Sequence, residues 1–248
     1  HGTPVSAALA PLVLAVLLAL AFVRRQRVVA VPLLQLRLFG NPVYRRAGLV
    51  AVIYGAGLFG STYLLPVFML VALHLQAGQV GQVLMPAGFA LAVTIPLAGR
   101  LADRAPLWRT LMIGLLVMAA TFAVMAGVGS ATAVAWLTLW AVLGRIGLGL
   151  VIPSLSLSAM RAIDIQGVAS GAGTMNFLRQ LGGAIGVNAV GIVLETRLQA
   201  HAGLGSAGML RAFHEVFLLM ATVTAAAAVV AWQMRPAAQA GSGSGAAG

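Results

Sequence analysis

The sequence contains no cysteine and no lysine, and only four of its 248 residues are acidic. Without cysteine, the chain has no disulfide framework, no thiolate metal site and no cysteine nucleophile. Charged residues make up 8% of the chain and hydrophobic residues 61%, whereas soluble domains carry roughly 25% charged residues. This composition excludes an ordinary soluble domain and predicts an integral membrane protein.

Long apolar runs dominate the rest of the chain. A membrane-spanning helix needs about 20 mostly apolar residues, and the alternating ten-residue segments of a β-barrel are absent. The sequence therefore predicts an all-α, polytopic membrane helix bundle with seven transmembrane helices. We place them at 5–23, 47–73, 80–98, 110–128, 132–158, 168–195 and 212–234.

The fifteen basic residues, all arginine, give the chain a formal charge of +11. Most of them fall in alternate connections between the predicted spans, as the positive-inside rule expects, so we predict no nucleic-acid partner. The rule places the N-terminus of this chain outside and its C-terminus in the cytoplasm of a bacterial-type inner membrane. We expect residues 24–46 to form a basic linker on the inner leaflet. The tail 235–248, rich in Ala, Gly and Ser, is expected to be disordered.

Polar and small residues are concentrated in particular spans. After the first span, the helices read polar, polar, apolar and again polar, polar, apolar. This order is typical of two three-helix units related as an inverted repeat, and it predicts that the third helix of each unit faces lipid. Gly182 and Gly186 lie one helical turn apart and predict a close helix-packing face.

Two arginines lie inside predicted spans. Arg179 follows Asn176 and precedes Gln180, and at bilayer depth a guanidinium costs about 2.5 kcal/mol or more unless it faces protein or water. Arg179 therefore either lines a transport cavity or tethers backbone carbonyls of a neighbouring helix. Arg145 has no carboxylate at its own depth, so carbonyls, water or another domain must satisfy it. From the polar and aromatic groups of these helices we predict a substrate cavity formed by Tyr54, Ser61, Gln82, Phe89, Arg145, Asn176, Arg179 and Gln180.

Three segments resemble one transporter family. The run GRLADRAPLWR, residues 99–109, is similar to the loop signature of the major facilitator superfamily. The runs SGAGTMNFLRQLGGAIGV, 170–187, and PLLQLRLFGNPVYRR, 32–46, resemble segments of its fourteen-span drug:proton antiporters of the EmrB/QacA type. The resemblance extends over nearly everything from residue 32 to residue 232.

The resemblance implies that 47–234 is the C-terminal six-helix domain and 1–23 a central helix. The N-terminal six-helix domain, a further partner beside the lipid bilayer, then lies outside this chain. The implied activity is proton-coupled multidrug efflux of small amphiphilic substrates by alternating access, with the proton as coupling ion and no other cofactor. It also implies a cytoplasmic gate loop made of Gly99, Asp103, Arg104 and Arg109. Ala105 and Pro106 depart from the loop signature, which normally has Gly before its basic pair.

Other functions remain open at this stage. A truncated or half-transporter that assembles with or regulates another protein fits the same sequence. An intramembrane enzyme would need acids, His or nucleophiles clustered at one depth, and the four acids are dispersed, so we expect no catalytic residue. A metal site made from His74, His201, His214 and Glu215 lacks ligand spacing. We therefore interpret these four as scattered residues of the outer loops.

Overall fold

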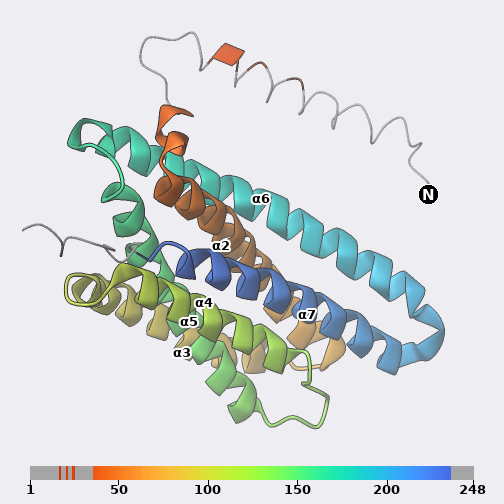
Figure 1. The fold of residues 1–248 in the computed structure, drawn as a ribbon. Helices are drawn as coiled ribbons and strands as arrows, with labels where there is room; N and C mark the ends of the chain where they lie inside the picture. The colour runs from red at the N-terminus through yellow and green to blue at the C-terminus, as the bar shows by residue number, and fades with distance from the viewer. Residues whose placement is uncertain (1–16, 18–20, 22–23, 26–35, 236–248) are drawn as a thin grey trace, which may run out of the picture.

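The computed structural model describes residues 36–235 together with Leu17, Ala21, Arg24 and Arg25 (Figure 1). The predicted span 5–23, most of the linker and nearly all of the tail lie outside the described residues. Within the described part the chain is helical and contains no strand. The predicted all-α fold is therefore confirmed.

Six of the helices are long and apolar enough to cross a membrane. They are α2 (Pro42–Val67), α3 (Ala77–Ala102), α4 (Leu107–Met125), α5 (Val134–Met160), α6 (Val168–Ala200) and α7 (Gly205–Trp232). A π-helical turn, Phe68–Ala72, extends α2, and short 3-10 helices occupy Leu36–Gly40, Ile165–Gly167 and Ala202–Leu204. Six of the seven predicted spans are thus present.

Four helices, α2, α3, α4 and α7, begin before the apolar run predicted for them, and α3, α5 and α6 end after it. At the start of α2, the Asn41 side chain accepts hydrogen bonds from the backbone N–H groups of Val43 and Tyr44, and Pro42 occupies the first turn. Both features favour a helix start. The last residues of the predicted linker, including Arg45 and Arg46, therefore belong to a helix. Hydropathy marks the part of a helix that crosses lipid, whereas capping decides where the helix begins.

The helices pack as two interlocked units of three. In Figure 1, α2 lies along α6 and α4 lies along α7, while α3 and α4 both pack on α5. The helices α2, α3 and α4 of the first unit correspond in order to α5, α6 and α7 of the second. Under this correspondence the α2/α6 pair is equivalent to the α5/α3 pair, and the α4/α7 pair is equivalent to itself. This correspondence agrees with the predicted 3+3 organisation.

That α4 and α7 are the lipid-facing helices stays a prediction, because their outer faces carry exposed apolar side chains such as Ile113 and Val229. The two helices pack against each other, and 50% and 44% of their most apolar windows are buried, against 17% for α3 and 28% for the α6 span. Hydropathy cannot distinguish a helix face packed on protein from a face in contact with lipid, because lipid tails and neighbouring Leu side chains are equally apolar. The second helix of each unit is the more exposed one.

Glycines set the distance between α2 and α6. A Cβ atom at Gly55 would overlap the backbone of Arg179, and one at Gly182 would overlap the backbone of Val52. A Cβ at Gly186 would likewise overlap Ala56. Small residues permit such close backbone approach, which confirms the predicted packing face of α6.

Candidate functional site

A cavity of about 270 Å³ lies where α2 meets α5 and α6. It belongs to both three-helix units, because α2 comes from the first and the other two helices from the second. Its walls are formed by Ala51, Tyr54, Ile152, Leu155, Ser156, Met160, Ala172, Met175, Asn176 and Arg179. Three predicted residues, Tyr54, Asn176 and Arg179, are thus brought to one site.

Arg179 lies on the α6 wall of this cavity. It is eleven residues from the start of the helix, which corresponds to about 17 Å along its axis. Its Nη2 donates a hydrogen bond of 2.6 Å to Oδ1 of Asn176, one turn earlier on the same helix face. The structure shows no hydrogen bond from Arg179 to a carbonyl of a neighbouring helix in the part of the chain it describes. Arg179 therefore lines the cavity in this structure, and its role in substrate binding stays a prediction.

Tyr54 forms the kind of hydrogen bond to a backbone carbonyl of a neighbouring helix that we considered for Arg179. Its side chain is fully buried, and its hydroxyl donates to the backbone carbonyl of Leu148 on α5 at 3.2 Å. Nearer the start of α2, the hydroxyl of Tyr44 donates to the carbonyl of Gly171 on α6 at 3.0 Å. Buried hydroxyls normally find such partners. These two bonds fix α2 against both other walls of the cavity.

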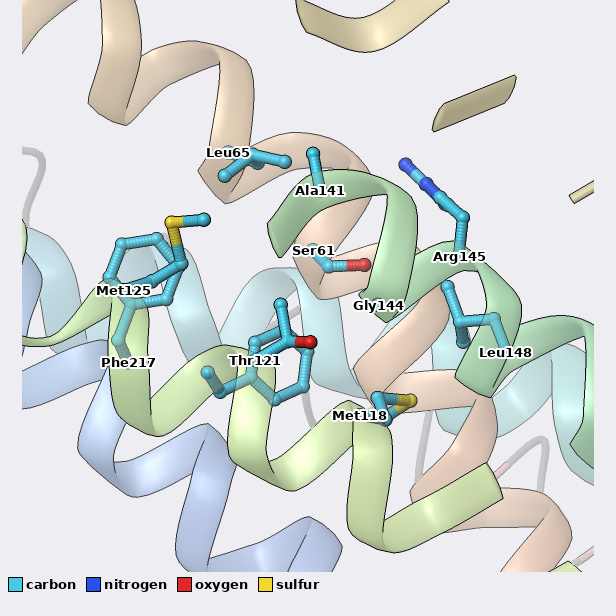
Figure 2. A pocket seen from close by; sticks show the side chains of 11 residues that line it. Ser61, Leu65, Met118, Thr121, Met125, Ala141, Gly144, Arg145, Leu148 and Phe217 are labelled. Atoms are coloured by element: carbon cyan, nitrogen blue, oxygen red, sulfur yellow. The ribbon is translucent and has the colours of Figure 1, made fainter. Parts of the chain in front are cut away.

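Arg145 lies at the edge of a second, smaller cavity inside the bundle. This cavity of about 30 Å³ lies among α2, α4, α5 and α7, with Ser61 and Thr121 as its neutral polar groups. Figure 2 shows the Arg145 side chain at its margin, away from Thr121 and Phe217. A space of this size is far below the roughly 300–1,000 Å³ of ligand pockets. The smaller cavity is therefore too small for a drug-sized molecule.

The partner of Arg145 is Thr62 on α2. Both terminal nitrogens of the guanidinium donate to the Thr62 Oγ1, each at 3.4 Å. The same hydroxyl donates to the carbonyl of Leu58 at 2.8 Å. A neutral side chain on another helix thus satisfies part of the charge, which the sequence could not indicate across a separation of 83 residues.

The site carries positive charge without a carboxylate. Arg179 lines the larger cavity and Arg145 the smaller one, so each cavity has one guanidinium in its wall. Neither cavity has an acidic residue in its wall. The four acids of the chain are Asp103, Asp164, Glu195 and Glu215, and all lie outside these walls.

Three of the predicted cavity residues lie elsewhere. Gln82 and Phe89 are on the uncovered face of α3, where Phe89 is 73% exposed, and Gln180 is exposed on α6. None of the three lines either cavity. The sequence identified the polar helices correctly, but it did not show which face of each helix turns towards its neighbours.

The contribution of α5 to the main cavity was missed. Ser154 and Ser158 are buried inside the bundle, whereas Ser156 between them lines the cavity. Residues two apart point to different sides of a helix, so Ser156 faces the cavity when its neighbours face the core. The spacing of the three serines is the sequence signal that could have identified Ser156 as a cavity residue.

The predicted gate loop joins α3 to α4. Asp103 ends α3, and the next two backbone N–H groups both bond to the carbonyl of Leu101. Asp103 is exposed and forms no ion pair with any residue that the structure describes. Arg109 lies 5.2 Å from the ring centre of Trp108, a cation–π distance. Arg104 is exposed, and a Cβ at Gly99 would contact nothing within 4 Å. The role of this loop as a gate stays a prediction.

The interpretation of the outer residues as scattered is wrong for two of them. His201 Nε2 lies 3.0 Å from one carboxylate oxygen of Glu215, and Arg197 Nε lies 3.1 Å from the other. The Nε2 of His214 instead contacts the carbonyl of Val128 at 2.8 Å. The described residues contain no group of three or more His, Cys, Asp or Glu side chains that could hold a metal.

Six membrane-length helices in two three-helix units, with a charged cavity where the units meet, are typical of a secondary-transporter type of membrane protein. The family model described as Major Facilitator Superfamily matches residues 3–187. The chain therefore belongs to the major facilitator superfamily.

Relatives with transporter names share this sequence at modest identity. The Multidrug resistance protein B homolog of Mycobacterium tuberculosis is 29% identical over 166 residues, covering 66% of this chain and 31% of that protein. The Multidrug transporter protein MdtP of Bacillus subtilis is 25% identical over 67% of this chain and 31% of that protein. The Colistin resistance protein EmrB of Acinetobacter baumannii is 26% identical over 68% and 33%, respectively. The chain spans about a third of the length of these relatives.

Proposed function

We propose that this chain is the C-terminal six-helix domain, with a preceding central helix, of a proton-coupled multidrug exporter that works by alternating access. The observation that carries the proposal is the cavity between the two three-helix units, with Arg179 and Asn176 in its wall. Substrate sites of secondary transporters lie at such repeat interfaces. The names of the relatives support drugs as the substrate class.

The uncovered faces of α3 and α6 support a second domain as partner. Met85 and Phe89 on α3 are 76% and 73% exposed, and Ile185 and Ile192 on α6 are also exposed. Polar groups such as Gln180 lie on α6 as well, and polar groups facing lipid directly are costly. Protein or a wet cavity against these faces removes that cost. In our proposal the N-terminal six-helix domain supplies this cover.

Proton coupling requires a titratable group within the membrane. The walls of both cavities contain no acid. In the proposed transporter, this chain therefore supplies cavity wall and gate, and the other domain supplies the proton-carrying carboxylates. The arginine distribution supports an inner-membrane location with the C-terminus in the cytoplasm.

The proposal is tested by export from cells and by everted membrane vesicles that contain the whole protein. Addition of a transported drug should release protons from energised vesicles, and collapse of the proton gradient should abolish drug uptake. Arg179→Ala should reduce uptake, whereas Arg161→Ala, an exposed arginine at the end of α5, should not. Vesicles that take up no drug above the level of empty membranes would refute the exporter and favour a non-transporting assembly partner.

A further inference from the structure

We propose that the cavity between α2, α5 and α6 binds the anionic group of an amphiphilic substrate, with Arg179 as its counter-charge. This inference rests on the proposed transport function and names the substrate class of the same site. The substrate class is an organic acid with one carboxylate and an apolar, preferably aromatic, body.

The first argument is the balance of charge. Arg179 hydrogen-bonds only to the neutral Asn176, and Arg145 only to the neutral Thr62, among the residues that the structure describes. No acid lines the cavity. At bilayer depth a guanidinium without a carboxylate partner is costly, and an anionic ligand lowers that cost while a cationic ligand increases it.

The second argument is the supply of hydrogen-bond donors. A guanidinium has five N–H donors in a planar fork that matches a carboxylate, and the bond to Asn176 uses one of them. The exposed Ser156 adds a hydroxyl to the opposite wall. The Tyr54 hydroxyl already donates to Leu148, so it offers only acceptor capacity. Arg179 is the group that can bind both oxygens of a carboxylate.

The third argument is the shape and polarity of the remaining wall. Ile152 and Leu155 on α5 give it an apolar surface, and Met160 and Met175 lie at the same cavity. Methionine side chains adapt to differently shaped apolar groups. A volume of about 270 Å³ is near the lower end of the range for ligand pockets, roughly 300–1,000 Å³. One acid group beside a compact ring fits these walls.

One competing occupant is a carboxylate from the other domain, which would neutralise Arg179 and open the cavity to cations. The two arrangements differ in ligand preference. We would therefore measure equilibrium binding of radiolabelled 1-naphthylacetate, 1-naphthylacetamide and 1-naphthylmethylammonium to the whole purified protein in detergent. The three probes share one ring system and differ in charge.

We expect the acid to bind about tenfold or more tightly than the amide, because charge-assisted hydrogen bonds exceed neutral ones. Arg179→Gln should weaken binding of the acid by roughly tenfold to a hundredfold and change that of the amide by less than about twofold. Arg179→Lys should keep part of the preference for the acid, because it keeps the charge and loses the fork. Arg161→Gln is the matched control, since it removes an equal charge outside the cavity.

Equal binding of acid and amide by the wild-type protein would overturn the inference, as would an equal loss of both in Arg179→Gln. Preference for the ammonium probe would also overturn it and identify the competing carboxylate. A melting temperature for Arg179→Gln close to that of the wild type excludes misfolding as the cause. Export of cationic drugs by a protein that does not prefer the acid probe would refute only this inference. Absence of any drug export would refute the proposed function itself.

Discussion

Replacing Gly182 with alanine should separate α2 from α6 and destabilise the bundle. The added methyl group would overlap the carbonyl oxygen, the Cα and the carbonyl carbon of Val52 on α2. Backbone atoms cannot rotate away as a flexible side chain can. The helices must therefore move apart by a shift on the order of 1 Å, which is the usual response to overpacking.

The magnitude follows from two opposing effects. Overpacking of this kind costs roughly 1–3 kcal/mol. Alanine in a helix interior is more favourable than glycine by about 0.5–1 kcal/mol. Gly191 on the same helix measures the second effect alone, because a Cβ there would contact nothing within 4 Å. Gly182→Ala should therefore be less stable than wild type, and Gly191→Ala equally or more stable.

The assay is thermal unfolding of the whole protein in detergent. The chain has no cysteine, so thiol-reactive dyes do not report its unfolding, but its four tryptophans do. A shift of about 2–4 °C is expected for each kcal/mol in a domain of this size. Gly182→Ala should melt several degrees below Gly191→Ala. Because α2 and α6 both form walls of the cavity, drug binding should weaken in the same variant.

Equal melting temperatures for Gly182→Ala and Gly191→Ala would refute this reasoning. They would mean that α2 and α6 lie further apart than the structure shows, or that the membrane protein absorbs the methyl group without cost. Normal drug binding by a destabilised Gly182→Ala would separate the helix contact from the cavity.

Three further predictions concern the ends of the helices. Single cysteines at Gln76 and Gly205 should react with a membrane-impermeant maleimide from outside the cell, while one after residue 248 should not. Labelling of the last position alone would show that the chain has the opposite orientation in the membrane. Asp103→Asn should reduce export at unchanged membrane abundance if the gate loop works as a latch, because the side chain makes no ion pair with a described residue whose loss would destabilise the fold. Full export would show that it is only a loop residue. Glu215→Gln should lower stability by at most about 1 kcal/mol, and less in high salt, because its ion pair with Arg197 and its contact with His201 are partly exposed. Glu195→Gln, which loses only a contact to a neighbouring glutamine, is its control and should show no salt-dependent change.

Part of the candidate site was predictable because its signal is local. A charged residue in an apolar run stands out at any position, which is why Arg179 and Asn176 were found together. Tyr54 was found because aromatic and glycine residues cluster around it. By contrast, Gln82 and Phe89 lie on an uncovered face of α3, and residue type alone does not show whether a face of a membrane helix packs on protein.

The sequence by itself determined the class of protein, the number and position of the membrane-length helices after residue 36 and the repeat order of polar and apolar spans. These properties depend on runs of neighbouring residues, because the cost of placing a polar group in lipid is set by its own segment.

Only the tertiary structure decided which helices meet and which faces they turn to one another. The bond of Arg145 to Thr62, the bond of Tyr54 to the carbonyl of Leu148 and the contact of Gly182 with Val52 all join residues far apart in the chain. In a membrane, lipid tails and apolar side chains solvate a helix face about equally well, so hydropathy does not specify its partner. Close packing and a small number of polar contacts make that choice, and both depend on the assembled bundle.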